Sequence, residues 1–486
     1  MLFPTGTFVA FFVAVFAVSW ALARYARVWK PFLIVASYFF YAFWGWKYAL
    51  LLAGYTLVTW LLGWWLASAG RDLVHEEPAR GRSRARGGIL ALALVLDLAP
   101  LAFFKYYGFI AFNLSEIFHW FGLAGTGSLL QVAIPVGISF TTFRGVAYLI
   151  DVYRGKADKA SLLDFALFMS FFPYLAAGPI TRTTELLPQL KTRGSARQID
   201  ATRALYLIAL GLAKKVVIGD FLARSIVTGV FSAPAQYSSL GIVIGIHAYA
   251  VQIYCDFSGY SDMAIGIALL LGFELPVNFN RPYTSTSVRD FWRRWHMTLS
   301  SWIRDYLYIP FGGSRRGAFA TYRNLVITMV IAGLWHGAGW TFLAWGLLHG
   351  AALAVEHALA DRRKRKGLAP AAPGTLGLVV RRVVTLEFVV LAWIFFRAES
   401  MGAAVRVIAA TFTAWNRVPS VSWLVILAIA AGLGLQYLPG ALTDRLQAFL
   451  SRRWPVVQGL VFGMVLFAIV GVFGAEGISN FIYVGF

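Results

Sequence analysis

The sequence has a single cysteine, Cys255, and few charged residues of either sign. One cysteine excludes an intrachain disulfide. Only 13% of the 486 residues are charged and 59% are hydrophobic, which leaves too little polar surface for a soluble protein of this size. Low-complexity segments are absent as well, and so is the pattern of a cleavable signal peptide. The first apolar segment, Thr5 to Ala23, is long enough to remain as a membrane-spanning helix.

Acidic residues are scarce. The sequence has 22 Asp and Glu residues and 43 Lys and Arg residues, which gives a formal net charge of +21. In a soluble protein this excess would suggest nucleic-acid binding. Here the basic residues mostly flank apolar segments and no base-reading module is recognisable, so we expect no nucleic-acid partner. The basic clusters at 24–30 and 71–86 are separated by two expected crossings. Both clusters are therefore expected in the cytoplasm, with the N-terminus on the opposite, extracytoplasmic side.

Apolar segments close to the ~20 residues needed to cross a bilayer recur along the whole sequence. They predict an all-α polytopic integral membrane protein with about ten to twelve transmembrane helices in one domain, residues 1–486. The apolar segment at 240–271 is too long for one straight crossing. It contains the polar run 256–262, where we expect the helix to break.

The segment 278–317 differs from its surroundings, because it is rich in Arg, Trp and Tyr and has no long apolar run. Large apolar residues recur at steps of three and four from Phe291 to Tyr306, which predicts an amphipathic helix. Such a helix would lie in the membrane interface or enter the membrane as a re-entrant element, and it carries His296. The following segment, 325–357, predicts apolar helices that carry two more histidines, at 336 and 349.

His336 is the leading candidate for chemistry. It lies in Gly-Leu-Trp-His-Gly-Ala-Gly-Trp, where Gly333 and Gly337 have the small-xxx-small spacing that lets helices approach closely. An imidazole beside Trp335 in a dry pocket would suit removal of a proton from a hydroxyl group. The alternative is a histidine that stabilises helix packing through a hydrogen bond, and the residues alone leave both readings open.

His296 is the second candidate. On a helix, its face would also carry Trp292 and Ser300, at i−4 and i+4, with Arg293 close by. It could orient an acyl donor or help to polarise a carbonyl group. The residues alone favour a plainer role, as an interfacial histidine. For His349 we expect packing or a helix–helix hydrogen bond that supports the pocket.

Three arginines are candidates for holding phosphate groups of a ligand, by their charge and location: Arg293, Arg294 and Arg304. The glycine-rich basic segment 311–317 would cradle a phosphate or form an ordinary turn, and it lacks the lysine pattern of a P-loop. The histidines lack metal-ligand spacing and no thiolate lies near them, so we expect no metal site.

Several long motifs, in order, resemble the membrane-bound O-acyltransferase family. They are similar to the bacterial branch that includes the alginate O-acetylation and D-alanylation membrane proteins. The motifs are Ile-Pro-Val-Gly-Ile-Ser-Phe-Thr-Thr-Phe at 134–143, Tyr-Cys-Asp-Phe-Ser-Gly-Tyr-Ser-Asp at 254–262, Asn-Phe-Asn-Arg-Pro-Tyr at 278–283, Arg289–Ser300, and Leu-Trp-His-Gly at 334–337. The tail at 481–486 departs from the pattern of this branch.

The resemblance implies tilted helices around a central funnel, with His336 as the catalytic histidine and His296 at the second family position. It implies an acyl thioester as substrate, most simply acetyl-CoA, and no bound cofactor. It also implies relay of the acyl group to an extracytoplasmic transferase of the SGNH-hydrolase-like type and then to a polysaccharide such as alginate. The expected location is the bacterial cytoplasmic (inner) membrane, in contact with its lipids.

Two other functional classes remain open. Many crossings with buried ionisable residues also fit a transporter of an acyl donor or of a lipid-linked sugar, although we find no repeated halves. A scaffold that assembles an exporter is the third class, and it would tolerate loss of both histidines. Within the enzyme class, a lipid, a peptide or a cell-wall polymer would also serve as acceptor.

Overall fold

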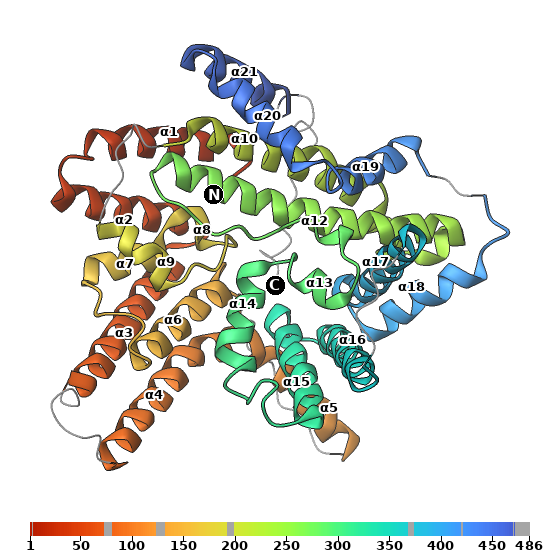
Figure 1. Cartoon of the computed structure of the whole chain (residues 1–486), viewed down its shortest axis with the longest axis horizontal. Coiled ribbons are helices and arrows are strands. Elements are labelled where there is room, and N and C mark those ends of the chain that lie inside the picture. The colour runs from red at the N-terminus through yellow and green to blue at the C-terminus, as the bar shows by residue number, and fades with distance from the viewer. Residues whose placement is uncertain are drawn as a thin grey trace. The chain divides into compact units, whose positions relative to one another are not determined.

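The computed structural model describes residues 1, 3–71, 80–122, 132–191, 199–367, 374–418, 421–469 and 471. Throughout this part of the chain the regular structure is helical and no strand occurs, so the predicted all-α fold is confirmed. Figure 1 shows these helices in chain order. The chain divides into two compact units: Met1–Ala204 with Ala264–Pro276, and Leu205–Met263 with Val277–Gly485. The predicted tail motif at 481–486 lies outside the described residues.

The first unit contains most of the N-terminal helices. They are α1 (Gly6–Ala21), α2 (Ala26–Ala42), α3 (Trp46–Arg71), α4 (Arg80–Leu101), the π-helix η1 (Ala102–Tyr106), α5 (Tyr107–Trp120), α6 (Ile138–Tyr153), α7 (Leu162–Ser170), α8 (Phe172–Leu175) and α9 (Thr183–Lys191). Hydroxyl caps define some of the helix starts. The Thr5 side chain accepts the Phe8 N–H at the start of α1, and Ser161 accepts the Asp164 N–H at the start of α7.

The second unit contains most of the remaining helices, while α10 (Ala201–Leu212) and α12 (Ser239–Leu270) contribute residues to both units. Its helices are η3 (Ala213–Asp220), η4 (Ala223–Val227), α11 (Thr228–Ser232), η5 (Pro234–Gln236), η6 (Pro282–Thr284), α13 (Val288–Trp292), α14 (Met297–Ile303), η7 (Arg304–Tyr308), α15 (Ala318–His336), α16 (Trp340–Arg365), α17 (Thr375–Arg397), α18 (Met401–Thr413), α19 (Trp423–Gly434), α20 (Gly440–Ser451) and α21 (Pro455–Ala468).

Five helical segments in the described residues are long and apolar enough to cross a membrane: Trp46–Ala69, Ala85–Trp120, Ser239–Leu270, Ala318–His336 and Trp340–Arg365. Four shorter apolar helices, of 10–17 residues, accompany them. The protein is therefore a multi-pass membrane protein. The total of about ten to twelve crossings stays a prediction.

The break that we predict within 256–262 is wrong, because α12 runs without interruption from Ser239 to Leu270. Two lysines of η3 neutralise the carboxylates of this run. Lys214 Nζ lies 2.7 Å from Asp262 Oδ2, and Lys215 Nζ lies 2.6 Å from Asp256 Oδ1. Paired in this way, the buried carboxylate of Asp256 and the partly buried carboxylate of Asp262 remain inside a continuous helix.

The single amphipathic helix that we predict from Phe291 to Tyr306 is also wrong. Helix α13 ends at Trp292 and α14 begins at Met297, because His296 adopts a left-handed backbone with φ of 43°. A hydrogen bond to the preceding loop stabilises this interruption. The Met297 N–H donates to the Asn278 carbonyl oxygen (2.9 Å), which the continuous helix could not provide.

Candidate active site

Helices α15 and α16 form a closely packed pair that carries two of the three candidate histidines, and they run side by side in Figure 1. Glycines make this approach possible. A Cβ atom on Gly333 would lie 2.2 Å from the Phe342 carbonyl oxygen, and one on Gly346 would lie 2.4 Å from the Met329 carbonyl oxygen. The close approach expected at Gly333 is thus present, and it fixes His336 and His349 relative to each other.

His336 is the last residue of α15 and is only 2% exposed. Aromatic rings surround it: the ring centroids of Trp335, Trp345 and Phe396 lie 4.8, 5.0 and 5.0 Å from the imidazole centroid. The α-helix stops there because the next residue, Gly337, has an extended backbone. The imidazole is thus enclosed in a largely apolar environment, as we expect for a group that works away from water.

His296 is completely buried and pairs with Asn278. The Thr298 N–H and Thr298 hydroxyl group both donate to Asn278 Oδ1, at 3.3 and 2.9 Å, so this oxygen is the acceptor. His296 Nδ1–H therefore also donates to Asn278 Oδ1 (3.0 Å), which leaves the acceptor lone pair of the ring on Nε2. Burial lowers the pKa of His296 to about 3, so the imidazole is neutral at pH 7.

The role of Asn278 was missing from the sequence-based site, although the motif at 278–283 contains it. Asn278 and His296 lie in two neighbouring motifs, and an amide can hold a histidine ring by a hydrogen bond. That combination is the sequence signal that would have identified Asn278. Asn278 is 1% exposed, and its Nδ2 donates to Ser261 Oγ (3.1 Å). The amide is thereby fixed, and through its Oδ1 it fixes the orientation of the His296 ring.

Two tryptophans connect the three histidines. Trp335 lies between His296 and His336, with ring centroids 6.3 and 4.8 Å away. Trp345 lies between His336 and His349, at 5.0 and 4.9 Å. The structure therefore brings together, in one buried aromatic cluster, all three histidines that the sequence singled out.

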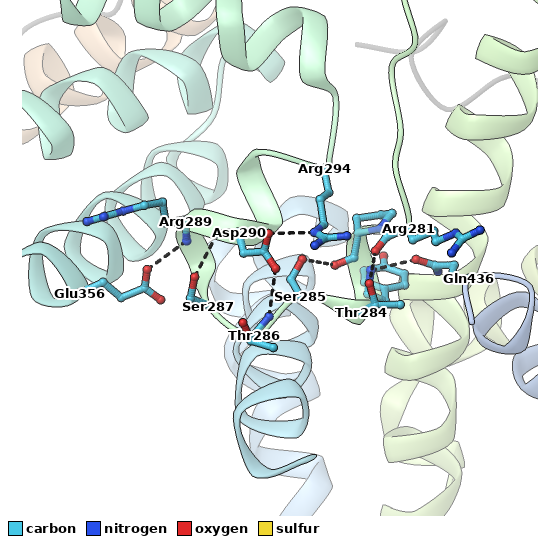
Figure 2. A network of polar contacts seen from close by, with 12 residues as sticks. Arg281, Thr284, Ser285, Thr286, Ser287, Arg289, Asp290, Arg294, Glu356 and Gln436 are labelled. Atoms are coloured by element: carbon cyan, nitrogen blue, oxygen red, sulfur yellow. Dashed lines mark hydrogen bonds and ion pairs between the residues drawn. The ribbon is translucent and has the colours of Figure 1, made fainter. Parts of the chain in front are cut away.

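His349 is fully buried, and its Nδ1 accepts the Nε1–H of Trp292 (3.3 Å). Glu356, seven residues after His349 on the same helix, does not contact it; its carboxylate accepts the N–H groups of Val288 and Arg289 (2.6 and 3.0 Å). Glu356 thereby caps the start of α13 (Figure 2). His349 holds Trp292, which in turn forms part of a cavity wall.

A cavity of about 600 Å³ lies beside this cluster, within the second unit. Its walls include Trp292, Ser300 and three arginines, Arg289, Arg293 and Arg304. The lining does not include the histidines at 296, 336 and 349, so Trp292 separates the cavity from the aromatic cluster. Arg304 Nε already pairs with Asp305 Oδ1 at 2.7 Å, so Arg289 and Arg293 supply the excess of positive charge, which suits an anionic ligand such as a phosphate group.

Two of the three predicted donor-binding arginines, Arg293 and Arg304, thus line the cavity, whereas Arg294 does not. Arg294 Nε instead pairs with Asp290 Oδ1 at 2.8 Å, as Figure 2 shows. Arg289 was not among the sequence candidates. Its Nη2 donates to His357 Nδ1 (3.2 Å), a contact between residues 68 positions apart that no local pattern reveals.

No group of three or more His, Cys, Asp or Glu side chains that could hold a metal ion occurs in the described part of the chain. The basic segment 311–317 forms turns at Gly312 and Gly313, which have positive φ. Asn324 Nδ2 donates to the carbonyl oxygens of Phe311 and Gly313, at 3.2 and 3.0 Å. Only Ser314 of this segment is among the residues that line the cavity.

Comparisons with known proteins show what this chain is similar to. Residues 92–372 match the sequence model described as MBOAT, membrane-bound O-acyltransferase family. The chain is 41% identical over 417 residues to the "Probable alginate O-acetylase AlgI" of Pseudomonas aeruginosa, covering 85% of this chain and 75% of that protein. It is 36% identical over 439 residues to the peptidoglycan O-acetyltransferase of Helicobacter pylori, covering 84% and 79%. It is 28% identical over 304 residues to the teichoic acid D-alanyltransferase of Streptococcus thermophilus, covering 56% and 69%.

Proposed function

Because this chain belongs to the membrane-bound O-acyltransferase family, we propose that it moves an acetyl group across the membrane, from a cytoplasmic thioester to an extracytoplasmic acceptor. The acceptor would be a polysaccharide, reached directly or through an extracytoplasmic transferase of the SGNH-hydrolase-like type. The names of two relatives specify O-acetyl transfer, one of them to alginate, and this supports acetyl as the acyl group. The protein would lie in the bacterial cytoplasmic membrane with its N-terminus extracytoplasmic.

The observation that carries the proposal is the enclosure of His336 by three aromatic rings, one of which, Trp335, also contacts the second buried histidine, His296. In the proposed step, the hydroxyl oxygen of the acceptor attacks the thioester carbonyl carbon, and the His336 imidazole takes the proton of that hydroxyl group. A C–O bond forms, the C–S bond breaks, and the thiolate leaves and takes up a proton. The dry surroundings would exclude water as a competing acceptor.

The geometry narrows the role of His296. With Nδ1–H directed at Asn278, the neutral ring presents Nε2 as an acceptor. An acceptor nitrogen cannot stabilise negative charge on a carbonyl oxygen. We therefore assign His296 to orienting the donor, by accepting an N–H group of the donor, rather than to polarising the thioester.

The arginine-lined cavity is the proposed binding site for the polar end of the donor. Acetyl-CoA carries phosphate groups, and Arg289, Arg293 and Arg304 are the cations at this cavity. Its volume, about 600 Å³, falls within the range of small-molecule sites. The thioester end would then pass Trp292 on the way to His336, so this tryptophan must move when the donor binds.

A two-label experiment tests the proposal. The purified protein in liposomes receives acetyl-CoA labelled with ¹⁴C in the acetyl group and ³H in the adenine, with an oligosaccharide acceptor trapped inside. We expect ¹⁴C to reach the acceptor while ³H stays outside. Entry of both labels together, with the thioester intact, would mean that the protein is a carrier and would refute acyl transfer.

A further inference from the structure

A second cavity, of about 230 Å³, lies within the first unit and is separate from the arginine-lined cavity. The loop between α6 and α7, residues 156–160, forms one side. The first turn and the later residues of α9 form the other, including Thr183, Thr184 and Lys191. Nothing in the proposed acyl transfer uses these residues.

The charge of this cavity favours an anion. Three lysines line it, Lys156, Lys159 and Lys191, against one exposed aspartate, Asp158. The other carboxylate in the lining belongs to Asp164, and it is already neutralised by Lys30, whose Nζ lies 2.5 Å from Asp164 Oδ1. An excess of positive charge therefore faces the cavity, which favours an anion such as a phosphate group.

The helix α9 adds polar groups to the same cavity. Its first turn carries backbone N–H groups with no intrahelical acceptor, and these attract anions. Thr183, in that turn, lines the cavity and is 1% exposed, and its Oγ1 has no hydrogen-bond partner among the described residues. A buried hydroxyl group without a partner is costly, and a phosphate oxygen would supply one.

The tryptophans near this cavity have the pattern of a membrane interface. Lys159 Nζ lies 4.4 Å from the ring centroid of Trp64, which is 50% exposed, and it donates to Ser68 Oγ at 2.8 Å. Trp60 Nε1–H donates to the Ala160 carbonyl oxygen (3.0 Å) and so ties the loop to α3. Exposed tryptophans beside lysines at the end of a spanning helix are typical of a membrane interface.

We propose that this cavity binds the phosphate of an anionic phospholipid, such as phosphatidylglycerol. The acyl chains would lie along the apolar surface of α3 beside Trp64 and the phosphate would lie among the three lysines. A lipid is favoured over a soluble phosphate because Lys159 of this cavity packs on the exposed Trp64, which belongs to a helix long and apolar enough to span the membrane.

The test uses the full-length protein with Lys156 and Lys191 both changed to glutamine. Both side chains are exposed, so their loss should leave the fold intact. The matched control is the pair Lys364→Gln and Lys366→Gln, two exposed lysines at the end of α16 with the same change of charge. Native mass spectrometry and thermal melting in nanodiscs compare phosphatidylglycerol with phosphatidylcholine.

We expect the wild type and the control to retain phosphatidylglycerol and to melt at a higher temperature in it than in phosphatidylcholine. The Lys156/Lys191 variant should bind it about thirtyfold more weakly, since each lysine near an anionic lipid changes the affinity by roughly fivefold. Equal retention by the Lys156/Lys191 variant and the control would overturn the proposal. Full stabilisation by inorganic phosphate alone in phosphatidylcholine discs would overturn it as well, because the ligand would then be a soluble phosphate.

Discussion

Replacing Gly346 by alanine should separate α15 from α16 and displace the histidines that these helices carry. The added Cβ would lie 2.4 Å from the Met329 carbonyl oxygen and 2.9 Å from the Val330 Cα. Both of these are backbone atoms of α15, so rotation of a side chain cannot relieve the clash. The helices must instead move apart.

The size of the movement follows from the distances. Contacts of Cβ atoms below 3.0 Å are essentially unknown, so the gap of 2.4 Å must widen by about 0.6 Å or more. Displacing reacting groups by ~1 Å costs on the order of a hundredfold in rate, so we expect about a tenfold loss of acyl transfer. Overpacking of this kind also lowers the free energy of unfolding by about 1–3 kcal/mol.

The assay measures transfer of labelled acetyl groups per folded molecule, together with thermal melting in detergent. Gly54→Ala is the matched control, because Gly54 lies inside the long helix α3 and its added Cβ would meet no atom within 4 Å. This control should keep its activity and melting temperature. A Gly346→Ala protein with the wild-type rate and melting temperature would show that the spacing of α15 and α16 does not matter.

Three further predictions concern polar contacts. Asn278→Ala should lower the turnover number about tenfold, because His296 loses the oxygen that orients its ring. Asn278→Asp keeps such an oxygen and should restore most of the activity. Equal rates in the two variants would contradict this role of Asn278. Arg293→Gln should raise the KM for the thioester donor about threefold to tenfold, whereas Arg294→Gln should leave this KM unchanged. Of these two arginines, Arg293 lines the cavity and Arg294 pairs with Asp290. A larger effect of the Arg294 substitution would count against the assignment. Lys215→Met should lower the free energy of unfolding by about 3–5 kcal/mol, because the buried carboxylates of Asp220 and Asp256 would lose their cation. Thermal melting measures this loss. An unchanged melting temperature would show that these ion pairs are dispensable.

The fold class could be predicted from the sequence, and so could the choice of the three histidines that the structure brings together. Low charge and repeated apolar segments predict membrane helices without reference to tertiary contacts. The spacing of Gly333 and Gly337 predicts close packing near His336, and a Cβ on Gly333 would indeed meet the neighbouring helix. These features are local, and so their signals lie in short stretches of sequence.

The errors arose where distant residues decide local structure. Helix α12 stays continuous through a polar run because lysines from another helix, Lys214 and Lys215, neutralise its carboxylates. The helix expected around His296 is interrupted because the chain pairs with the backbone of Asn278. Arg289 lines the cavity and donates a hydrogen bond to His357, which lies 68 positions away in the sequence. Such pairings depend on tertiary packing, which periodicity cannot report.

The most direct test of the account measures acetyl transfer after His336 is changed to glutamine or to alanine, in protein shown to be folded by melting and by donor binding. Since general-base catalysis contributes about 10²- to 10⁴-fold, we predict a loss of that size in the turnover number. The affinity for the donor should stay close to that of the wild type, because the lining of the arginine-lined cavity does not include His336. A folded variant that transfers acetyl groups at the wild-type rate would contradict the assignment of His336 as the base.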